Sequence, residues 1–396
     1  MLRDILSELE NKLKSIIKSS DYYPVVYNAN KVNESNYRKR ALLVYLPESF
    51  LLNEDDPEFL THQNLRQCRQ IAVLLDEFGY IVDAVHWRNI GPPWNRNYDL
   101  IVSDRADLKG VDAFFKKNAI KIFLATSDNY IVHNRLLRKR HESLTERRGT
   151  NVKVRRIFPE ALPYLMKSDA IIGFGNELIM STWKELFRGP AFPFNNYGFN
   201  GTELPDSKDF AAARNNFLFF ASRSQVQKGL DLLLEIFPRH PHLHLYVCSG
   251  FEKEKDFCAC YHKELYETSN IHPIGWVTVN GGEYDELVKK CAYVIHPTCS
   301  EGQPGSVVQC MYSGLIPIVT RAAGIDTEDF GITFLDDSLE EIERVIVEVS
   351  QLPESWHRER SIGTRKICDE KYSEDAFINR WKKILAEILN PPKVSK

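Results

Sequence analysis

The stretch YVIHPTCSEGQPGSVVQCMYSGLIPIVT (residues 293–320) decides the fold class of this chain. Two short apolar runs, at 293–298 and 315–320, flank a glycine-containing loop and the helical segment VVQCMYSG. A buried strand, a tight loop, a helix and a second buried strand predict one unit of a parallel sheet. In such sheets ligands bind at the carboxyl ends of strands, where loops lead into helix amino termini. The loop that begins at Glu301 is therefore the first candidate binding site.

The same alternation of apolar runs and amphipathic segments extends through most of the chain and predicts two Rossmann-like domains. We expect further strands at 41–47, 80–87, 98–103, 120–126, 168–175, 217–222, 244–250 and 271–277. Gly, Pro, Asn and Asp concentrate at 189–216, which is the best linker candidate. We predict an amino-terminal domain at 1–210, a carboxyl-terminal domain at 211–374, and a last helix at 375–396 that packs back on the first domain.

Composition indicates an ordinary globular protein of cytoplasmic type. The 396 residues are 43% hydrophobic and 27% charged, and the net charge of -3 argues against a uniformly basic nucleic-acid binder. The eight cysteines lack zinc-site spacing and the density of a disulfide scaffold, which favours a reducing compartment.

The first 18 residues alternate charges with apolar residues at helical spacing, which is not the pattern of a signal peptide. The sequence has no run of the roughly 20 apolar residues that a membrane span needs. This helix is expected either to pack on the protein or to lie on a membrane surface.

Two cations follow the strand at 217–222. Arg223 comes directly after it, and Lys228 with Gly229 opens the next helix. Arginine offers a planar fork and lysine a point charge, both near the positive end of a helix dipole. Together they suit a diphosphate.

The loop after the strand at 293–298 is built for close approach to a ligand. Gly302 and Gly305 let the backbone come near it, and Pro304 stiffens the loop at the helix start. Glu301 would lie at the mouth of the crevice, and Gln309 could point its amide toward it.

HPTCSEGQPGSVVQCMYSGLIPIV, with FLFFASRSQVQKG upstream, resembles the retaining glycosyltransferases of the GT-B fold, especially glycosyltransferase family four (glycosyl transferases group one). The resemblance implies an α/β fold of two Rossmann-like domains with an interdomain cleft. It also implies that Arg223 and Lys228 hold the donor diphosphate and that Glu301 contacts the donor sugar. The match is specific over about residues 215–335 and weak in the amino-terminal half, where the usual glycine-rich loop is missing.

By the same resemblance, a run of loop residues lines the donor-sugar site: Gly302, Gln303, Pro304, Gly305 and Ser306. The family's Glu-x7-Glu signature begins at Glu301, but Gln309 replaces the second glutamate, which grips the nucleotide ribose. An amide accepts with its oxygen and donates with its nitrogen, so ribose binding is expected to be weaker or altered.

The sequence contains no Asp-x-Asp triplet, which disfavours the metal-clamped GT-A design. Arg223, Lys228 and a helix dipole would then neutralise the leaving diphosphate. We therefore predict a metal-independent enzyme with no cofactor besides its nucleotide-sugar substrate.

In the first domain, the strand at 120–126 ends at Ser127, Asp128 and Asn129, where an acceptor hydroxyl could bind. His133 follows closely, and in similar enzymes a histidine near this point assists at the donor sugar. A surface or helix-capping histidine is the alternative.

Residues 133–156 contain nine Lys or Arg against two Glu. One interpretation is a solvated helix face. The other is a landing patch for an anionic membrane at the inner face, or for a phosphorylated or acidic acceptor.

Two smaller signals keep alternatives open. His240, His242 and His244 alternate on one face of an extended segment, but they lack an obvious carboxylate, so we predict no metal site. Trp276 either stacks on the nucleotide base or packs against the sheet edge.

The leading hypothesis is retaining transfer of a sugar from a nucleoside-diphosphate donor to a hydroxyl acceptor, which is a glycan, a lipid or a small molecule. One rival is a catalytically weakened GT-B protein that binds nucleotide or glycan. The other is a nucleotide-sugar epimerase.

Overall fold

The computed structural model describes residues 25–56, 58–59, 62–86, 88, 97–105, 115–160, 162–199 and 208–390. Internal contacts divide the chain into two compact units. The first comprises Met1–Leu124, Ala161–Ile171 and Ala386–Lys396, and the second comprises Ala125–Glu160 and Ile172–Leu385. The helix predicted at residues 1–18 lies outside the described residues. The domain limits at 210 and 374 remain predictions.

The first unit contains a parallel sheet with one antiparallel edge strand. Its strands are β1 (Val25–Val26), β2 (Lys39–Tyr45), β3 (Tyr80–His86), β4 (Tyr98–Ser103) and β5 (Phe115–Ala125). They are ordered β1-β3-β2-β4-β5, and β1 runs antiparallel to β3. β2 pairs in parallel with both β3 and β4, and β4 pairs with β5. The carboxyl ends of four strands therefore lie at one edge.

Helix α3 (Gln63–Glu77) forms where the apolar spacing predicts it. The buried side chains include Leu65, Cys68, Ile71 and Leu75, which recur at three- and four-residue spacing. Gly79 follows with a φ of +81°, a left-handed conformation that favours glycine just after a helix. Short 3-10 helices, η1 (Glu34–Asn36), η2 (Pro47–Phe50) and η4 (Leu165–Lys167), complete this unit.

The second unit is built on a parallel sheet of order β10-β9-β8-β11-β12-β13. Its strands are β8 (Asn216–Phe220), β9 (His244–Cys248), β10 (Ile271–Gly275), β11 (Tyr293–His296), β12 (Ile316–Val319) and β13 (Ile332–Thr333). β11, helix α12 (Gly305–Tyr312) and β12 form the strand–helix–strand unit predicted at 293–320, with β11 paired to β12 in parallel. The predicted α/β fold with parallel sheets is confirmed.

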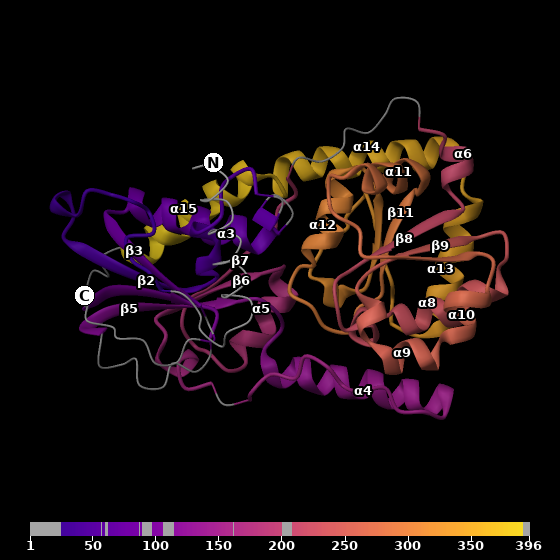
Figure 1. Ribbon diagram of the computed structural model, residues 1–396, viewed down its shortest axis with the longest axis horizontal. Coiled ribbons are helices and arrows are strands. Elements are labelled where there is room, and N and C mark those ends of the chain that lie inside the picture. The colour runs from indigo at the N-terminus through magenta and orange to yellow at the C-terminus, as the bar shows by residue number, and fades with distance from the viewer. Residues whose placement is uncertain are drawn as a thin grey trace, which may run out of the picture. The chain divides into compact units, whose positions relative to one another are not determined.

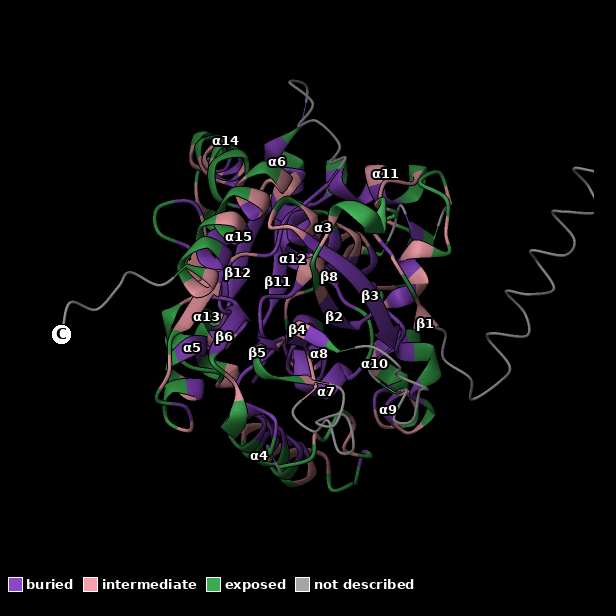
Figure 2. Ribbon diagram, turned by 90° about the vertical axis from the view of Figure 1, so that its left-hand side faces the viewer, coloured by how far each residue is buried: buried purple, intermediate pink, exposed green. Residues whose placement is uncertain are grey.

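Alternate residues of these strands pack on opposite faces of the sheet. Phe217 and Phe219 of β8 join one core, and Leu218 and Phe220 join the other. α8 (Leu230–Ile236), α9 (Lys255–Cys260), α10 (His262–Glu267) and α13 (Leu339–Gln351) cover the first face, and α11 (Gly282–Lys290), α12 and α14 (Glu354–Lys371) cover the second (Figure 1). The inner strands β8, β9, β11 and β12 are accordingly buried over nearly their whole length, and exposed residues lie on the outer helix faces (Figure 2). A strand buried on both sides explains the near-continuous apolar runs.

The second unit contains further elements outside this sheet and the helices already named. They are α4 (Tyr130–Arg148), β6 (Ala170–Phe174), α5 (Glu177–Lys184), β7 (Ala191–Phe194), α6 (Phe210–Ala213), α7 (Gln225–Lys228), η5 (Phe237–Arg239), η6 (Phe251–Lys253), η7 (Arg321–Ala323) and α15 (Glu374–Leu389). Of these, β6 begins in the first unit and α15 ends there. The short strand β7 falls inside the predicted linker at 189–216, where proline and glycine obscure a strand of four residues. Among the described residues, no helix has the length and apolarity to cross a membrane.

Candidate functional site

A buried ion pair joins two of the predicted site residues. Lys228 ends α7, and its Nζ donates to Oε2 of Glu301, which follows β11. The other carboxylate oxygen, Oε1, accepts from Nη1 of Arg156 at 3.1 Å. The side chains of Lys228 and Glu301 are only 5% and 7% exposed, whereas that of Arg156 is 36% exposed. Two cations therefore hold one carboxylate, and we call these three residues the ion cluster.

The ion cluster keeps Glu301 charged. Burial raises the pKa of this carboxyl, but the attraction of Lys228 and then of Arg156 outweighs burial and holds the pKa far below its usual range. For Lys228 the balance is the reverse, because burial lowers the ammonium pKa and Glu301 only partly restores it. Removal of either cation would leave negative charge on this buried carboxylate less compensated and would destabilise the folded protein.

A hydrogen-bond chain lies beside the ion cluster and includes two further predicted residues. His133 Nδ1 lies 2.8 Å from Ser300 Oγ, which in turn lies 2.8 Å from Asp128 Oδ2. The second ring nitrogen of His133, Nε2, lies 3.0 Å from the carbonyl oxygen of Arg156. Because a carbonyl only accepts, Nε2 must carry a proton.

In this series of hydrogen bonds, one proton can lie on either Asp128 or His133. When Ser300 donates to Asp128, both nitrogens of His133 are protonated. When His133 is neutral, Ser300 donates to Nδ1 and a protonated Asp128 donates to Ser300. Burial lowers the pKa of His133 to about 4 and raises that of Asp128 to about 7, so the second arrangement is favoured between about pH 4 and pH 7.

Backbone contacts hold α7 against the loop after β11. Gln227 accepts with its carbonyl from the backbone N of Cys299 at 2.9 Å and donates with Nε2 to the carbonyl of Ser300 at 2.6 Å. Gly229 has a φ of +81°, and a Cβ there would meet the carbonyl oxygen of Pro297 at 2.3 Å. A Cβ at Gly302 would meet the carbonyl oxygen of Thr126 at 2.6 Å. Only glycine fits at these two positions, which is why both loops meet so closely.

His296 is a buried polar residue beside this site that the sequence reasoning missed. It ends β11, is fully buried, and stacks on Phe219 with ring centroids 5.9 Å apart. Neither ring nitrogen has a hydrogen-bond partner within the described parts of the chain. Burial, and then the neighbouring Lys228, lower its pKa to about 3, so the ring is neutral. Its position at the end of an apolar strand gave it the pattern of a core residue.

Gln303 and Gln309 both bind the segment at 195–199. Gln309 Oε1 accepts from the backbone N of Phe199 at 3.1 Å, and its Nε2 donates to the carbonyl of Phe199 at 2.9 Å. Gln303 Oε1 accepts from the backbone N of Asn196 at 2.6 Å, and its Nε2 donates to Asn195 Oδ1 and the carbonyl of Gly324, both at 3.0 Å. In this structure both amides act as clamps between segments of the chain.

Arg223, Trp276 and the residues at the start of α12 form no ion pair with the ion cluster in the described part of the chain. Arg223 is exposed and forms no ion pair within the described ranges, and Trp276 is 64% exposed. Pro304 precedes α12 as its cap residue, Gly305 is the first helical residue, and Ser306 is half-buried. Asn129 caps α4 by accepting from the backbone N atoms of Ile131 and Val132.

Most of the positive charge at 133–156 is paired inside the second unit. Arg140 bonds Asp337 Oδ2 at 2.7 Å, and Arg147 bonds both Asp231 at 2.7 Å and Glu235. Arg148, Arg155, Arg156 and Arg138 contact Glu264, Asp256, Glu301 and Glu160. Arg135, Lys139 and Lys153 remain as the cations of this segment with no ion pair among described residues. The basic segment mainly attaches α4 to its neighbours, and the membrane interpretation stays a prediction.

The histidines at 240–244 pair with other groups. His240 Nε2 lies 2.7 Å from Glu343 Oε1, and His244 Nδ1 lies 3.1 Å from His272 Nε2. Within the described residues, no group of three or more His, Cys, Asp or Glu could hold a metal ion. All eight cysteines are free thiols.

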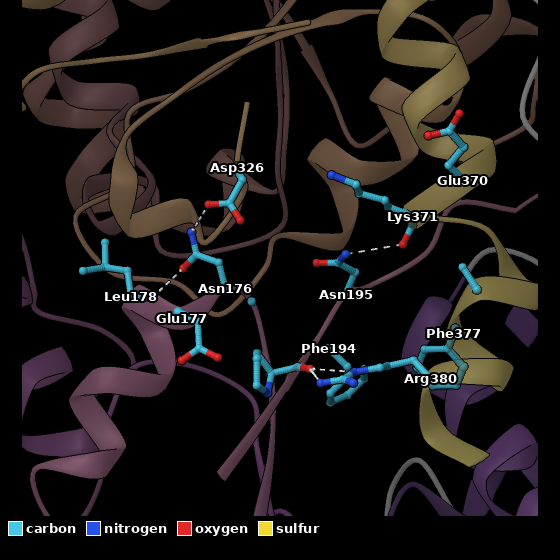
Figure 3. Close-up of a pocket in the computed structure, with 13 residues that line it drawn as sticks. Asn176, Glu177, Leu178, Phe194, Asn195, Asp326, Glu370, Lys371, Phe377 and Arg380 are labelled. Carbon is cyan, nitrogen blue, oxygen red and sulfur yellow. Dashed lines mark hydrogen bonds between the residues drawn. The ribbon is translucent and has the colours of Figure 1, made fainter. Parts of the chain in front are cut away.

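A separate pocket of the second unit lies between α5, β7, α14 and α15 (Figure 3). Asn176 donates to Asp326 Oδ1 at 2.6 Å, and Arg380 donates to the carbonyl of Pro193 at 3.2 Å. The carbonyl of Lys371 accepts from Asn195, which also accepts from Gln303. None of the predicted site residues lines this pocket.

Comparison with solved structures establishes the fold as GT-B. Sucrose-phosphate synthase from Thermosynechococcus elongatus has a TM-score of 0.59 at 13% identity, covering 89% of this chain and 99% of that one. Anabaena HepE, solved with UDP and glucose, has a TM-score of 0.55 at 12% identity, covering 89% and 100%. TarM of S. aureus has a TM-score of 0.52 at 15% identity over 74% of this chain, which spans about half of TarM, 55% of its length.

Part of the sequence also matches a known family. Residues 214–351 match the sequence model of the family described as Glycosyl transferases group 1. The chain therefore combines a GT-B fold with a match to this family over residues 214–351, the region around Arg223 and Glu301 where the resemblance was expected. The match supports the glycosyltransferase class of enzyme. No curated protein matches the chain.

Proposed function

We propose that this protein transfers a sugar from a nucleoside-diphosphate donor to a hydroxyl acceptor with retention of configuration. The observation that carries the proposal is the buried ion pair between Lys228 and Glu301 at the carboxyl ends of β8 and β11. It lies within the segment that matches Glycosyl transferases group 1. HepE, which shares the fold, was solved with UDP-glucose, and TarM was solved with UDP.

In this proposal, Lys228 and the exposed Arg223 bind the diphosphate, while Glu301 accepts hydrogen bonds from hydroxyls of the donor sugar. Positive side chains then stabilise the charge that develops on the leaving diphosphate, with no metal ion required. Asp128 and His133 lie beside the sugar end and position the acceptor hydroxyl. The protein contributes positioning and charge stabilisation and supplies no nucleophile of its own.

A catalytically weakened binding protein is the second candidate, and one observation favours it. Both polar atoms of Gln309 bond the backbone of Phe199 and the side chain is buried, so the amide is less accessible to a ribose than an exposed glutamate would be. A protein of this kind would bind nucleotide without turning it over.

A panel of nucleoside diphosphates and nucleotide sugars tests the proposal. A ligand that binds only the native state raises the unfolding temperature, which selects the donor. The selected donor is then incubated with hydroxyl acceptors, and product is followed by mass spectrometry. Transfer to an acceptor with the anomeric configuration kept supports the proposal.

Three other outcomes would contradict it. Stabilisation without turnover indicates the binding protein, and conversion of the donor sugar without an acceptor product indicates the epimerase. The absence of any binding to nucleoside diphosphates would exclude the proposed site altogether. Arg138→Ala is the control for nonspecific charge loss, because Arg138 pairs with Glu160 on the surface at 3.5 Å.

A further inference from the structure

Arg156 has an unusual backbone conformation. Its φ is +65°, in the left-handed region that a residue with a Cβ rarely adopts. This conformation lets one residue make two contacts with the site at once. Its carbonyl meets His133 Nε2 at 3.0 Å, and its guanidinium meets Glu301 Oε1 at 3.1 Å. Backbone strain of this kind tends to persist where it serves a site.

The side chain of Arg156 has donors to spare. A guanidinium carries five N–H donors, and the one hydrogen bond that it forms among the described residues is to Glu301. Its side chain is 36% exposed, whereas Lys228 and Glu301 are almost buried. The far side of the guanidinium is therefore open to a ligand that approaches the ion cluster.

The net positive charge of the ion cluster favours an anionic ligand. Lys228 and Arg156 together carry one positive charge more than Glu301 neutralises, and Arg223 is a further exposed cation after β8. A planar guanidinium suits bidentate contact with phosphate oxygens.

We propose that Arg156 is a phosphate-binding residue of the donor site, acting with Lys228 on the diphosphate while Glu301 holds its guanidinium in place. This inference rests on the proposed function and adds a third cation that lies outside the carboxyl-terminal motif. Glu301 is then both a contact for the sugar and the group that orients the arginine. Binding of donor leaves the Arg156–Glu301 contact in place and uses the free edge of the guanidinium.

Isothermal titration calorimetry of the full chain tests the proposal, with the nucleoside diphosphate that the panel selects and with inorganic pyrophosphate as probes. Arg156→Gly removes the guanidinium but keeps a residue that adopts a φ of +65° freely, so the carbonyl contact to His133 survives. Loss of a charge-assisted hydrogen bond predicts affinity at least about tenfold lower for both probes. Arg156→Lys should recover part of that loss, and Arg138→Ala should bind like the unmodified protein.

The outcomes separate this inference from the proposed function. If the unmodified protein binds neither probe, the donor site itself is wrong. If it binds them and Arg156→Gly binds equally well, the role of Arg156 is overturned and the proposed function stands. An equal loss for the nucleoside, which carries no phosphate, would also overturn it, because the effect would not follow the phosphates. Should Arg156→Gly fail to fold, Arg156→Gln is measured in its place under the same criteria.

Discussion

The two ends of the segment from Glu301 to Gln309 differ in kind. At the Glu301 end, Lys228 and Arg156 hold a buried carboxylate, and the three side chains together carry a net positive charge. At the Gln309 end, a neutral amide exchanges two hydrogen bonds with the backbone of Phe199. The charged end of this segment is therefore suited to bind a ligand, whereas the neutral end binds another segment of the same chain.

The chemistry of the two side chains explains the difference. An amide accepts with oxygen and donates with nitrogen, which matches the N–H and C=O of one backbone residue, whereas a carboxylate only accepts. Glutamate at 309 would place its oxygen against the carbonyl of Phe199. The departure from the Glu-x7-Glu pattern thus has a structural reason in the segment at 195–199.

The largest expected effect comes from breaking the charged end. Lys228→Met should lower the free energy of unfolding by about 3–5 kcal/mol, because Glu301 loses its buried partner. Transferase turnover should fall more than tenfold. Denaturant unfolding and a turnover assay measure the two effects. The double variant Lys228→Met, Glu301→Gln should regain stability without regaining turnover, and equal instability of both variants would contradict the ion-pair explanation.

Gln309→Glu sharpens the comparison at the neutral end. It removes one donor and sets a carboxylate against a carbonyl, so we expect a loss of about 1–3 kcal/mol in unfolding free energy. Gln351→Glu is the matched control, because Gln351 is exposed at the end of α13. If Gln309→Glu is as stable as its control and gains nucleotide affinity, the amide is a ribose ligand and the clamp is incidental.

Asp128 gives a smaller, pH-dependent effect. Burial raises its pKa in the folded protein to about 7, above the usual value of 3.8. Its contribution to stability is therefore present below about pH 4 and is lost as pH rises through 7. Asp128→Asn mimics the protonated form, since its amide can donate to Ser300. Relative to this variant, the unmodified protein should lose about 1–3 kcal/mol between pH 4 and 8. A pH-independent difference in chemical denaturation would argue against the shared proton.

Arg223→Ala should have the smallest effect on stability, within about 0.5 kcal/mol, because the side chain is exposed. Diphosphate affinity should still fall several-fold. Thermal unfolding and calorimetry distinguish these two quantities. Unchanged affinity would remove Arg223 from the donor site and leave Lys228 and Arg156 as its cations.

The sequence was sufficient for the fold and for two of the three residues of the ion cluster. Apolar runs buried on both faces and the spacing in α3 are local patterns, so the strands and the helix could be read directly. That Lys228 and Glu301 belong to one site also followed from two loops at one sheet edge, whereas their direct ion pair was not predicted. Arg156 could not be found, because it lies 145 positions from Glu301 and its charge was read as part of a basic helix. Its left-handed backbone conformation could not be predicted either, because an arginine does not indicate a positive φ.

The contacts of Gln303 and Gln309 with the segment at 195–199 were missed for a related reason. Gln303 and Gln309 had the pattern of ligand-facing amides because most of their partners lie in the segment at 195–199, more than 100 positions away. Likewise, the acids that neutralise α4, such as Asp231 and Glu264, belong to helices of the second sheet. Pairings at such separations depend on the tertiary fold.

The most direct measurement is calorimetric titration of the matching nucleoside diphosphate into the unmodified protein and into Glu301→Gln, Lys228→Met. This double variant replaces the buried pair by neutral groups of similar size. We predict saturable binding to the unmodified protein and a loss of at least about tenfold in the double variant at equal thermal stability. Equal affinity of the two proteins would contradict the assignment of the charged end as the donor site.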